Sequence, residues 1–422
     1  MIIGFGSREH ALAWRLAAID GVDRVCVAPG NAGTRSVAEN VPIGLGDTDA
    51  LLAFAKHENI DLTIVGPTSP LQSGVVDRFR AAGLCILGPT KSASLLETSK
   101  AFSKSLMKSA GIPTASWSAF EDSRDACRHL RKQGIESCVV KLDGPGTHGR
   151  GVVVCGSQEE AISAVRSFFA KPIPGPGAPR VLIEERLYGS EASFFALTDG
   201  RRLVPLMATR DYKRRYDRDE GPNTGGMGAV GPLSEDDLGI APGKVVEYLE
   251  RAAHEMRKSG RALNGIIYAG LIATADGVRF LEFNLRFGNP EALVLLPLLD
   301  CDLFTVSEAC AKGHLHDNSV RFSPGYAAAI MATTQNYVPG EHRDVTLDGA
   351  STEGTRAGPH VFHHGTYPLQ TTTVASRERV LGVAGTDETL AGALGKVYSR
   401  IDQVRFADIH YRRDIGAELL QT

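Results

Sequence analysis

A carboxylate, an amide and a guanidinium alternate with apolar residues in one short stretch of the chain. Glu282, Asn284 and Arg286 are each separated by a single apolar residue. Alternate side chains of a strand point to one face, so Glu282 and Asn284 share a face, and Arg286 joins them if the strand continues. Carboxylate and amide oxygens suit Mg²⁺, and an arginine beside them can stabilise charge developing on a phosphoryl or acyl group. A solvated strand face is the simpler alternative, which the apolar residues between them weaken.

Two glycine-rich loops could approach phosphates. Residues 143–151 lie between two expected strands and follow Lys141, so this loop could fold over phosphates with a lysine beside it. A flexible hairpin explains its four glycines equally well, and the loop lacks the ending of a Walker loop. The second loop, residues 221–229, follows the charged segment 210–215. Composition alone favours a solvated charge run and a turn there.

The first glycine turn and a histidine group are weaker candidates. Residues 4–9 resemble the start of a dinucleotide fingerprint, but Glu9 stands where the third glycine should be, which argues against NAD. A nucleotide or sugar phosphate at the following helix N-terminus, with Arg8 as a clamp, remains open. His360, His363 and His364 have no cysteine or acidic partner at ligand spacing, so we predict no metal there.

Composition narrows the class of protein. A chain of 422 residues is too long for one hydrophobic core and indicates two to four domains. A net charge of -3 gives no reason to expect a nucleic-acid partner, and no apolar run is long enough for a bilayer or a secretory signal. None of the seven cysteines forms a Cys-x-x-Cys pair, which is typical of reduced core residues in a cytoplasmic protein.

The elements that must position these residues divide the chain into four parts. Residues 1–99 alternate short strands and helices, and each strand ends in a Gly/Pro turn, which indicates a parallel sheet with ligands at its carboxyl edge. Residues 100–187 read as a small α+β lid, and residues 188–322 as a larger sheet with helices. The remaining residues, 323–422, read as short strands broken by glycine and proline. The expected fold is therefore α/β, or multidomain α+β.

Taken together, these segments resemble the ATP-grasp ligases, and within them the phosphoribosylamine–glycine ligase family. The matching stretches are residues 6–11, 28–34, 61–67, 99–102, 183–185, 221–229 and 281–290. Agreement in order over nearly the whole chain is more specific than one glycine loop. The resemblance implies a pre-ATP-grasp (Rossmann-like) domain at 1–99, a lid subdomain and linker at 100–187, an ATP-grasp core at 188–322, and a β-rich carboxy-terminal domain at 323–422.

The resemblance also implies a role for each matched position. The residues implied for ATP binding are Lys104, Lys141, Arg150, Glu184, Glu185, Leu187 and Glu191. Glu184 to Leu187 would be the hinge whose backbone meets adenine, and Glu191 would meet the ribose hydroxyls. Glu282 and Asn284 would hold Mg²⁺ or Mn²⁺, and Arg286 and Lys141 would be catalytic. The residues implied for substrate binding are Arg8, Glu9, Asp211, Lys213, Asn223 and Asn289.

The implied reaction is carboxylate–amine ligation. ATP would convert a carboxylate to an acyl phosphate, and an amine would displace phosphate, so the protein mainly positions reactants and neutralises charge. The family's substrates are glycine and 5-phosphoribosylamine, a step of purine biosynthesis. We therefore expect small-molecule substrates, no nucleic acid, no membrane, a cytoplasmic location, and a monomer or small homo-oligomer.

Four departures from the family pattern leave the substrates open. The phosphate loop is one residue longer, Thr68 and Asn289 stand where glutamate and aspartate are usual, and Ala292-Leu293 replace a polar pair. These changes affect substrate-facing positions more than ATP-facing ones. One alternative is therefore a diverged paralogue from a specialised-metabolite pathway, such as that of a nucleoside antibiotic, with another carboxylate or amine. A non-catalytic ATP-binding module is least favoured, because the ATP, metal and acyl-phosphate positions keep suitable residues.

Overall fold

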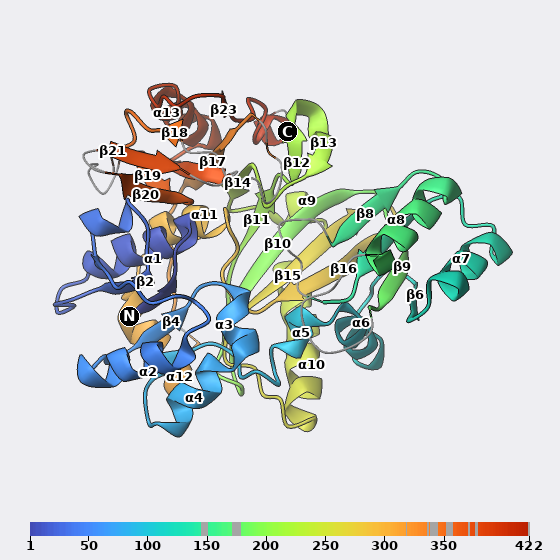
Figure 1. Ribbon diagram of the computed structural model, residues 1–422, viewed down its shortest axis with the longest axis horizontal. Coiled ribbons are helices and arrows are strands. Elements are labelled where there is room, and N and C mark those ends of the chain that lie inside the picture. The colour runs from blue at the N-terminus through green and yellow to red at the C-terminus, as the bar shows by residue number, and fades with distance from the viewer. Residues whose placement is uncertain are drawn as a thin grey trace.

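The computed structural model describes residues 1–144, 151–170, 179–317, 319–335, 337, 345–351, 358–369, 372–375 and 379–420. In Figure 1 the amino-terminal sheet and a small lid lie on opposite sides of a long central sheet, and the carboxy-terminal strands lie beside the amino-terminal part. In the described part of the chain, no helix has both the length and the apolarity needed to cross a membrane.

The amino-terminal part is the expected parallel sheet. Its strands, in the order β3-β2-β1-β4-β5, are β1 (Ile2–Gly4), β2 (Cys26–Pro29), β3 (Glu39–Asn40), β4 (Thr63–Val65) and β5 (Ile86–Leu87). Its helices are α1 (Ser7–Ala17), α2 (Thr48–His57), α3 (Thr68–Ser73) and α4 (Val75–Ala81). Ile2 and Ile3 point to opposite faces of β1 and are both fully buried, so helices cover both faces of the sheet. The turns after β1, β2 and β4 share the carboxyl edge.

The lid is a four-stranded sheet with two helices on it. The strands, in the order β6-β9-β7-β8, are β6 (Trp117–Phe120), β7 (Cys138–Leu142), β8 (Val152–Cys155) and β9 (Val181–Glu185); the helices are α7 (Ser123–Lys132) and α8 (Gln158–Ala170). The preceding helices α5 (Leu95–Thr98) and α6 (Lys100–Ser109) belong to another core, because Leu106 and Met107 pack in the same cluster as Phe280. These two helices therefore connect the amino-terminal sheet to the central sheet.

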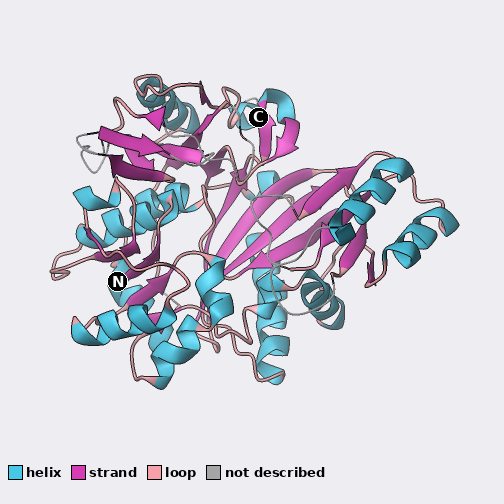
Figure 2. Ribbon diagram, in the orientation of Figure 1, coloured by secondary structure: helices cyan, strands magenta, loops and turns pink. Residues whose placement is uncertain are grey.

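One nine-stranded sheet forms the centre of the molecule and extends into the carboxy-terminal part (Figure 2). Its main order is β16-β15-β10-β11-β14-β17-β22-β19, and β23 pairs with β17. The strands are β10 (Ser190–Thr198), β11 (Leu203–Asp211), β14 (Gly228–Gly231), β15 (Gly265–Thr274), β16 (Gly277–Asn284), β17 (Tyr326–Thr334), β19 (His360–His363), β22 (Arg379–Asp387) and β23 (Ile409–His410). Helices α9 (Glu235–Leu238), α10 (Pro242–Lys258), α11 (Ala292–Leu298) and α12 (Leu303–Lys312) accompany the sheet. The small strands β12 (Arg214–Tyr216) and β13 (Glu220–Asn223) form a separate ribbon, and β18 (Val345–Thr346), β20 (Thr366–Leu369) and β21 (Thr372–Ala375) form another.

The carboxy-terminal part corrects one expectation. It is rich in strands, as predicted, but β17 and β22 each have nine residues rather than being short. It also contains the helix α13 (Leu390–Ile401), which we did not predict. The Thr389 hydroxyl caps this helix by accepting from the backbone N–H of Gly392, and the buried Leu390, Leu394 and Val397 pack it onto the sheet.

Candidate active site

Two lysines and one glutamate from three elements meet at the base of the lid. Lys104 of α6 and Lys141 of β7 place their Nζ atoms 2.9 Å and 2.8 Å from the same oxygen, Oε2 of Glu184 on β9. Lys104 and Glu184 are each 2% exposed. Among the residues described, Oε1 of Glu184 has no hydrogen-bond partner. One carboxylate therefore holds two ammonium groups together at a place where an anionic ligand would be attracted.

Burial changes the acidity of Lys104. Removal from water, and then the neighbouring charge of Lys141, lower the pKa of Lys104 to about 8. Lys104 Nζ also donates to the Thr114 hydroxyl at 2.6 Å, which fixes the side chain. Lys104 therefore changes charge in a range where enzymes are readily assayed.

We predict that kcat/KM for ATP falls as the pH rises through about 8. Below this pKa Lys104 is protonated and can attract phosphate, and above it Lys104 is neutral. The pH dependence of kcat/KM reports the pKa values of groups in the free protein. Initial rates from about pH 6.5 to 9.5 measure the effect. Lys104→Arg keeps its charge across this range, so the fall near pH 8 should disappear in that variant. A flat wild-type profile, or an unchanged fall in Lys104→Arg, would contradict the assignment.

The start of the glycine-rich loop is attached to α6. Asp143 accepts hydrogen bonds from the backbone N–H of Ala101 and the hydroxyl of Ser99, both at 3.3 Å. Lys100 Nζ donates to the carbonyl of Gly144 at 3.0 Å. These contacts fix where the loop leaves β7. Residues 145–150, with Arg150 among them, lie outside the described part of the chain.

The predicted adenine hinge connects the lid to the central sheet. Glu185 is the last residue of β9, and its carboxylate accepts from the backbone N–H and the hydroxyl of Ser116 at 3.1 and 3.0 Å. Leu187 lies in the segment between β9 and β10. Glu191, near the start of β10, binds Lys213 Nζ at 2.7 Å. The structure thus places the hinge residues along one connection between the two sheets.

The Glu282–Arg286 stretch has the predicted shared face and one departure. Glu282 and Asn284 lie together on β16, with Asn284 Nδ2 3.4 Å from Glu282 Oε1. The strand ends at Asn284, so Arg286 lies in the following turn and not on the strand. Its side chain nevertheless reaches back, because Nη2 donates to Asn284 Oδ1 at 3.0 Å. The side chains of Glu282, Asn284 and Arg286 are therefore adjacent, but Arg286 comes close because the chain turns after β16 and not because it continues the strand.

Several lysines surround Glu282. Burial acts to raise the pKa of Glu282, but Lys213, Lys141 and Lys100 outweigh it and lower that pKa, so the side chain is an anion. This charge suits a divalent cation together with phosphate oxygens. No group of three or more His, Cys, Asp or Glu side chains in the described ranges could hold a metal ion by itself. A carboxylate and an amide oxygen fit Mg²⁺, which uses few protein ligands and completes its shell with water and phosphate.

The charged segment before the second glycine loop is not a solvated run. Arg210 is 9% and Arg215 is 2% exposed, which corrects the expectation from composition. Lys213, in the connection after β11, binds Glu191 of β10 and lies 3.7 Å from Asp211 Oδ2 of β11, so its charge is paired. Burial is the main cause that raises the pKa of Asp211 to about 7, although Lys213 opposes it. Asp211 and Lys213, both expected to bind substrate, therefore lie among the charged groups of the candidate site.

Three further side chains join Asp211 and were not predicted. The Ser193 hydroxyl lies 3.2 Å from Asp211 Oδ1, 2.9 Å from Tyr268 Oη and 3.4 Å from Glu291 Oε1. Ser193, Tyr268 and Glu291 are at most 4% exposed. Burial raises the pKa of Tyr268 well above its usual value, so it stays a neutral hydrogen-bonding group. Nothing in the sequence around Ser193, a serine in an otherwise apolar strand, indicated that its hydroxyl would meet these side chains.

The amino-terminal turn faces the end of the Glu282–Arg286 stretch. Arg8 Nε donates to Glu9 Oε1 at 2.6 Å, and its Nη1 donates to the carbonyl of Phe287 at 2.9 Å. Glu9 Oε2 accepts from the N–H of Gly6 at 2.7 Å. In the neighbouring turn after β4, a Cβ at Gly66 would lie 1.9 Å from the Glu9 carboxylate, so glycine at this position leaves room for the Glu9 side chain. Glu9, which stands at the third glycine position of the dinucleotide fingerprint, thus fills the space between these turns.

Asn289 connects three parts of the chain. Its Oδ1 accepts from the Ser7 hydroxyl at 2.9 Å, and its Nδ2 lies 3.2 Å from Nδ1 of His364. Its carbonyl accepts from Arg379 at 2.9 Å. The second glycine loop packs here too, because a Cβ at Gly226 would lie 2.5 Å from the Pro290 ring. Asn223 lies on the β12–β13 ribbon at the start of that loop.

The histidines of the carboxy-terminal part have partners within the protein. His363 Nδ1 lies 3.0 Å from the Thr366 hydroxyl, and its Nε2 lies 2.9 Å from the carbonyl of Ala350. The N–H of His363 donates to Nδ1 of His10 at 2.9 Å. Burial lowers the pKa of both His10 and His363, so they are neutral near pH 7. They pack the amino- and carboxy-terminal parts together.

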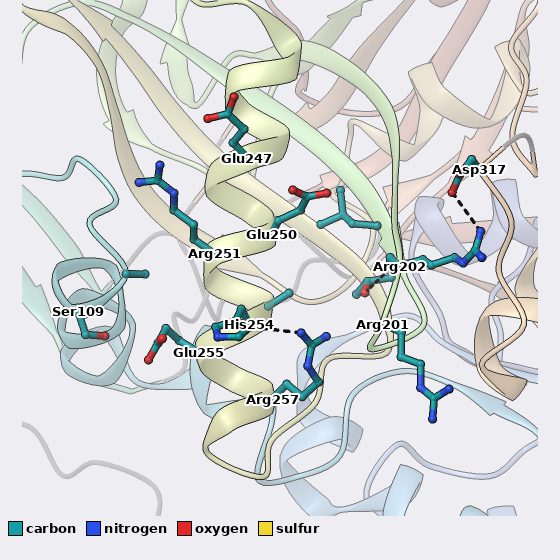
Figure 3. A pocket seen from close by; sticks show the side chains of 14 residues that line it. Ser109, Arg201, Arg202, Glu247, Glu250, Arg251, His254, Glu255, Arg257 and Asp317 are labelled. Carbon is teal, nitrogen blue, oxygen red and sulfur yellow. Dashed lines mark hydrogen bonds and ion pairs between the residues drawn. The ribbon is translucent and has the colours of Figure 1, made fainter.

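A cavity of about 770 Å³ lies away from all of these residues. It is beside α10, and arginines and carboxylates alternate along it (Figure 3). Arg202 pairs with Asp317 at 3.4 Å, and Arg257 donates to His254 at 3.3 Å. None of the residues with a predicted role lines this cavity. We therefore place the candidate active site at the converging charged groups and not at this cavity.

Comparison with known proteins identifies the family of the chain. Three family models match in chain order: the phosphoribosylglycinamide synthetase N domain at residues 1–97, the ATP-grasp (A) domain at 98–292, and the C domain at 327–418. The chain is 39% identical to the phosphoribosylamine–glycine ligase of Rhodopirellula baltica, covering 100% of this chain and 98% of that protein. It is also 39% identical to that of Halalkalibacterium halodurans, with 100% and 97% covered. A crystal structure of the Thermotoga maritima ligase superposes with a TM-score of 0.82 at 32% identity, covering 98% of this chain and 99% of that chain.

Proposed function

The chain belongs to the phosphoribosylglycinamide synthetase family, and on that premise we propose that it joins glycine to 5-phosphoribosylamine with ATP. The products are glycinamide ribonucleotide, ADP and phosphate, and the pathway is purine biosynthesis. One observation carries this proposal. Lys104 and Lys141 meet at Glu184, and Glu282, Asn284 and Arg286 lie in contact with one another. This convergence occurs in a chain that a relative of the family matches over its whole given length.

The lysine pair and the hinge are proposed to bind ATP. Adenine enters beside the backbone of Glu184 to Leu187, and Glu191 receives the ribose hydroxyls. Lys104 and Lys141 attract the phosphates, and the ionic bonds of both lysines to Glu184 place the two charges in advance. Arg150 is proposed to join them from the glycine-rich loop.

Glu282 and Asn284 are proposed to hold Mg²⁺ or Mn²⁺. When bound, this ion would neutralise charge on the phosphates of ATP. Arg286 faces the glycine carboxylate and the phosphoryl group, and its delocalised charge stabilises negative charge that develops during transfer. Lys141 assists from the phosphate side. The remaining work of the protein is to hold the two reactants in line and keep water from the acyl phosphate.

The amine substrate is proposed to enter from the amino-terminal sheet. The carboxyl edge of the parallel sheet, with the turns containing Arg8 and Glu9, faces Phe287, just beyond Arg286. Asp211, Lys213, Asn223 and Asn289 are proposed to complete the substrate side. The amine then attacks the acyl carbon, and phosphate leaves.

The relatives favour the substrates of the purine enzyme over another carboxylate or amine. A pathway-specific paralogue was the main alternative, but matches at 39% identity over whole chains carry the name of the purine enzyme. We further propose four units with boundaries near residues 99, 187 and 322, a cytoplasmic location, and a monomer or small homo-oligomer.

A coupled assay of ADP release tests the proposal. The purified protein should release ADP only when glycine, phosphoribosylamine, ATP and Mg²⁺ are all present. Phosphoribosylamine is unstable, so it is generated in the assay from ribose 5-phosphate and ammonia. A known ligase of this family serves as the positive control. No ADP release under conditions in which the control works would refute the substrates. Release with another carboxylate–amine pair would favour the paralogue and eliminate the non-catalytic alternative.

A further inference from the structure

Glu97 is a buried carboxylate at the junction of the amino-terminal and central sheets, and no role was expected for it. It lies on the short helix α5, and its side chain is 6% exposed. Its two oxygens have different partners. Oε2 accepts from the backbone N–H of Leu285 at 2.8 Å, and Oε1 accepts from the Thr68 hydroxyl at 2.7 Å. Oε1 also lies 3.3 Å from Nε of Arg286.

These contacts surround Arg286 with fixed acceptors. Nε faces Glu97 and the Thr68 hydroxyl, the latter at 3.5 Å, while Nη1 donates to the carbonyl of Phe287 at 3.2 Å. Nη2 donates to Asn284 at 3.0 Å. A planar guanidinium held at all three nitrogens has little rotational freedom. Glu97 is the only anion among these four partners.

The charge of Arg286 depends on the carboxylates around it. Burial acts to lower the pKa of Arg286, and the carboxylates of Glu97, Glu291 and Glu282 raise it above its usual value. Arg8 is a second buried guanidinium nearby, and the charge of Arg286 contributes to lowering the pKa of Arg8. The two guanidinium groups repel each other, and the ion pair with Glu97 opposes that repulsion at Arg286.

We propose that Glu97 is a positioning residue that, with the Thr68 hydroxyl, fixes Arg286 in the orientation needed for acyl-phosphate formation. The family usually has a glutamate at the place of Thr68. In this chain the shorter Thr68 donates to Glu97, so a carboxylate still lies at this edge of the site. The inference rests on the proposed function of Arg286, and it assigns Glu97 no contact with substrate.

A double-mutant cycle tests this role. Glu97→Ala should lower kcat by about 10- to 100-fold and leave KM for ATP within about twofold, because the ATP lysines lie on other elements. In an Arg286→Met background, the same change should cost less than about twofold, since the group it positions is gone. Thr68→Val, which keeps the shape, should cost only about two- to fivefold.

A conservative variant separates positioning from folding. Glu97→Gln keeps one oxygen to accept from the N–H of Leu285 and an NH₂ that can donate to the Thr68 hydroxyl, but it loses the charge, so kcat should fall by about 10-fold while the melting temperature stays near wild type. The matched control is Glu39→Gln at an exposed ion pair, which should change nothing. Equal losses from Glu97→Ala in both backgrounds, or a normal kcat in Glu97→Gln, would overturn the proposal. If the wild type makes no glycinamide ribonucleotide, the proposed function fails instead.

Discussion

Glu282→Ala is expected to reduce ADP release by at least about a thousand-fold. The variant removes the carboxylate of β16 that is proposed to hold the metal ion and leaves the amide of Asn284 as the one proposed ligand. It also removes one anion near Lys100, Lys141 and Lys213, although Lys141 keeps its pair with Glu184 and Lys213 its pair with Glu191. The loss should appear in kcat at saturating substrates and should not be recovered by a tenfold excess of Mg²⁺.

Two further measurements make the Glu282 result specific. Glu282→Gln has nearly the same shape, which matters because Glu282 packs against Gly270, where a Cβ would lie 3.2 Å from Glu282 Cγ. Titration of a fluorescent ATP analogue with and without Mg²⁺ should show a metal-dependent gain in affinity in the wild type that Glu282→Gln loses. Glu308→Ala, at the exposed Glu308–Lys312 pair, is the matched control and should behave as wild type. A near-normal rate in Glu282→Gln would refute the metal assignment.

Arg286→Met is expected to lower kcat by about 100- to 1,000-fold, the usual effect of removing one group that stabilises transition-state charge. Methionine replaces the length of the arginine side chain but neither its charge nor its donors. Because ATP is proposed to bind at Lys104, Lys141 and the hinge, KM for ATP should change by less than about threefold. Rates measured over a range of ATP and glycine concentrations separate the two parameters.

Arg286→Lys identifies which property of the arginine matters. Lysine keeps the positive charge, but it cannot reach Asn284, Phe287 and Glu97 together, as the planar guanidinium does. We expect kcat to fall between that of the wild type and that of Arg286→Met. A change in KM for ATP with kcat preserved would mean that Arg286 only binds nucleotide, contrary to the proposed role.

The sequence predicted those parts of the fold whose signals are local. The strands and Gly/Pro turns of the first hundred residues repeat at short intervals, and the parallel sheet followed from them. α13 was missed although Leu390, Leu394 and Val397 have helical spacing, because Gly392 and Gly395 lower helix propensity. α11 was missed because nearly all of it is buried and apolar, so it has no amphipathic period.

The site was predicted where a single stretch contains it and missed where distant residues meet. The shared face of Glu282 and Asn284 follows from the alternation of side chains along a strand. The position of Arg286 depends on the turn after the strand, which alternation does not predict. Glu97 contacts Leu285 across 188 positions of sequence, and Ser193 meets Glu291 across 98. The segment around Asp211 looked solvated because charge pairing between strands is invisible in composition.

The most direct test of the central claim follows an oxygen atom from glycine. If the protein activates the carboxylate as an acyl phosphate, one carboxylate oxygen bridges to phosphorus and leaves with phosphate when the amine attacks. Glycine labelled with ¹⁸O in both carboxylate positions is incubated with ATP, Mg²⁺, phosphoribosylamine and the protein, and the phosphate is analysed by mass spectrometry. We predict one ¹⁸O atom in each phosphate released and one retained in glycinamide ribonucleotide. Unlabelled phosphate would contradict the account, because ATP would then be cleaved without activating glycine.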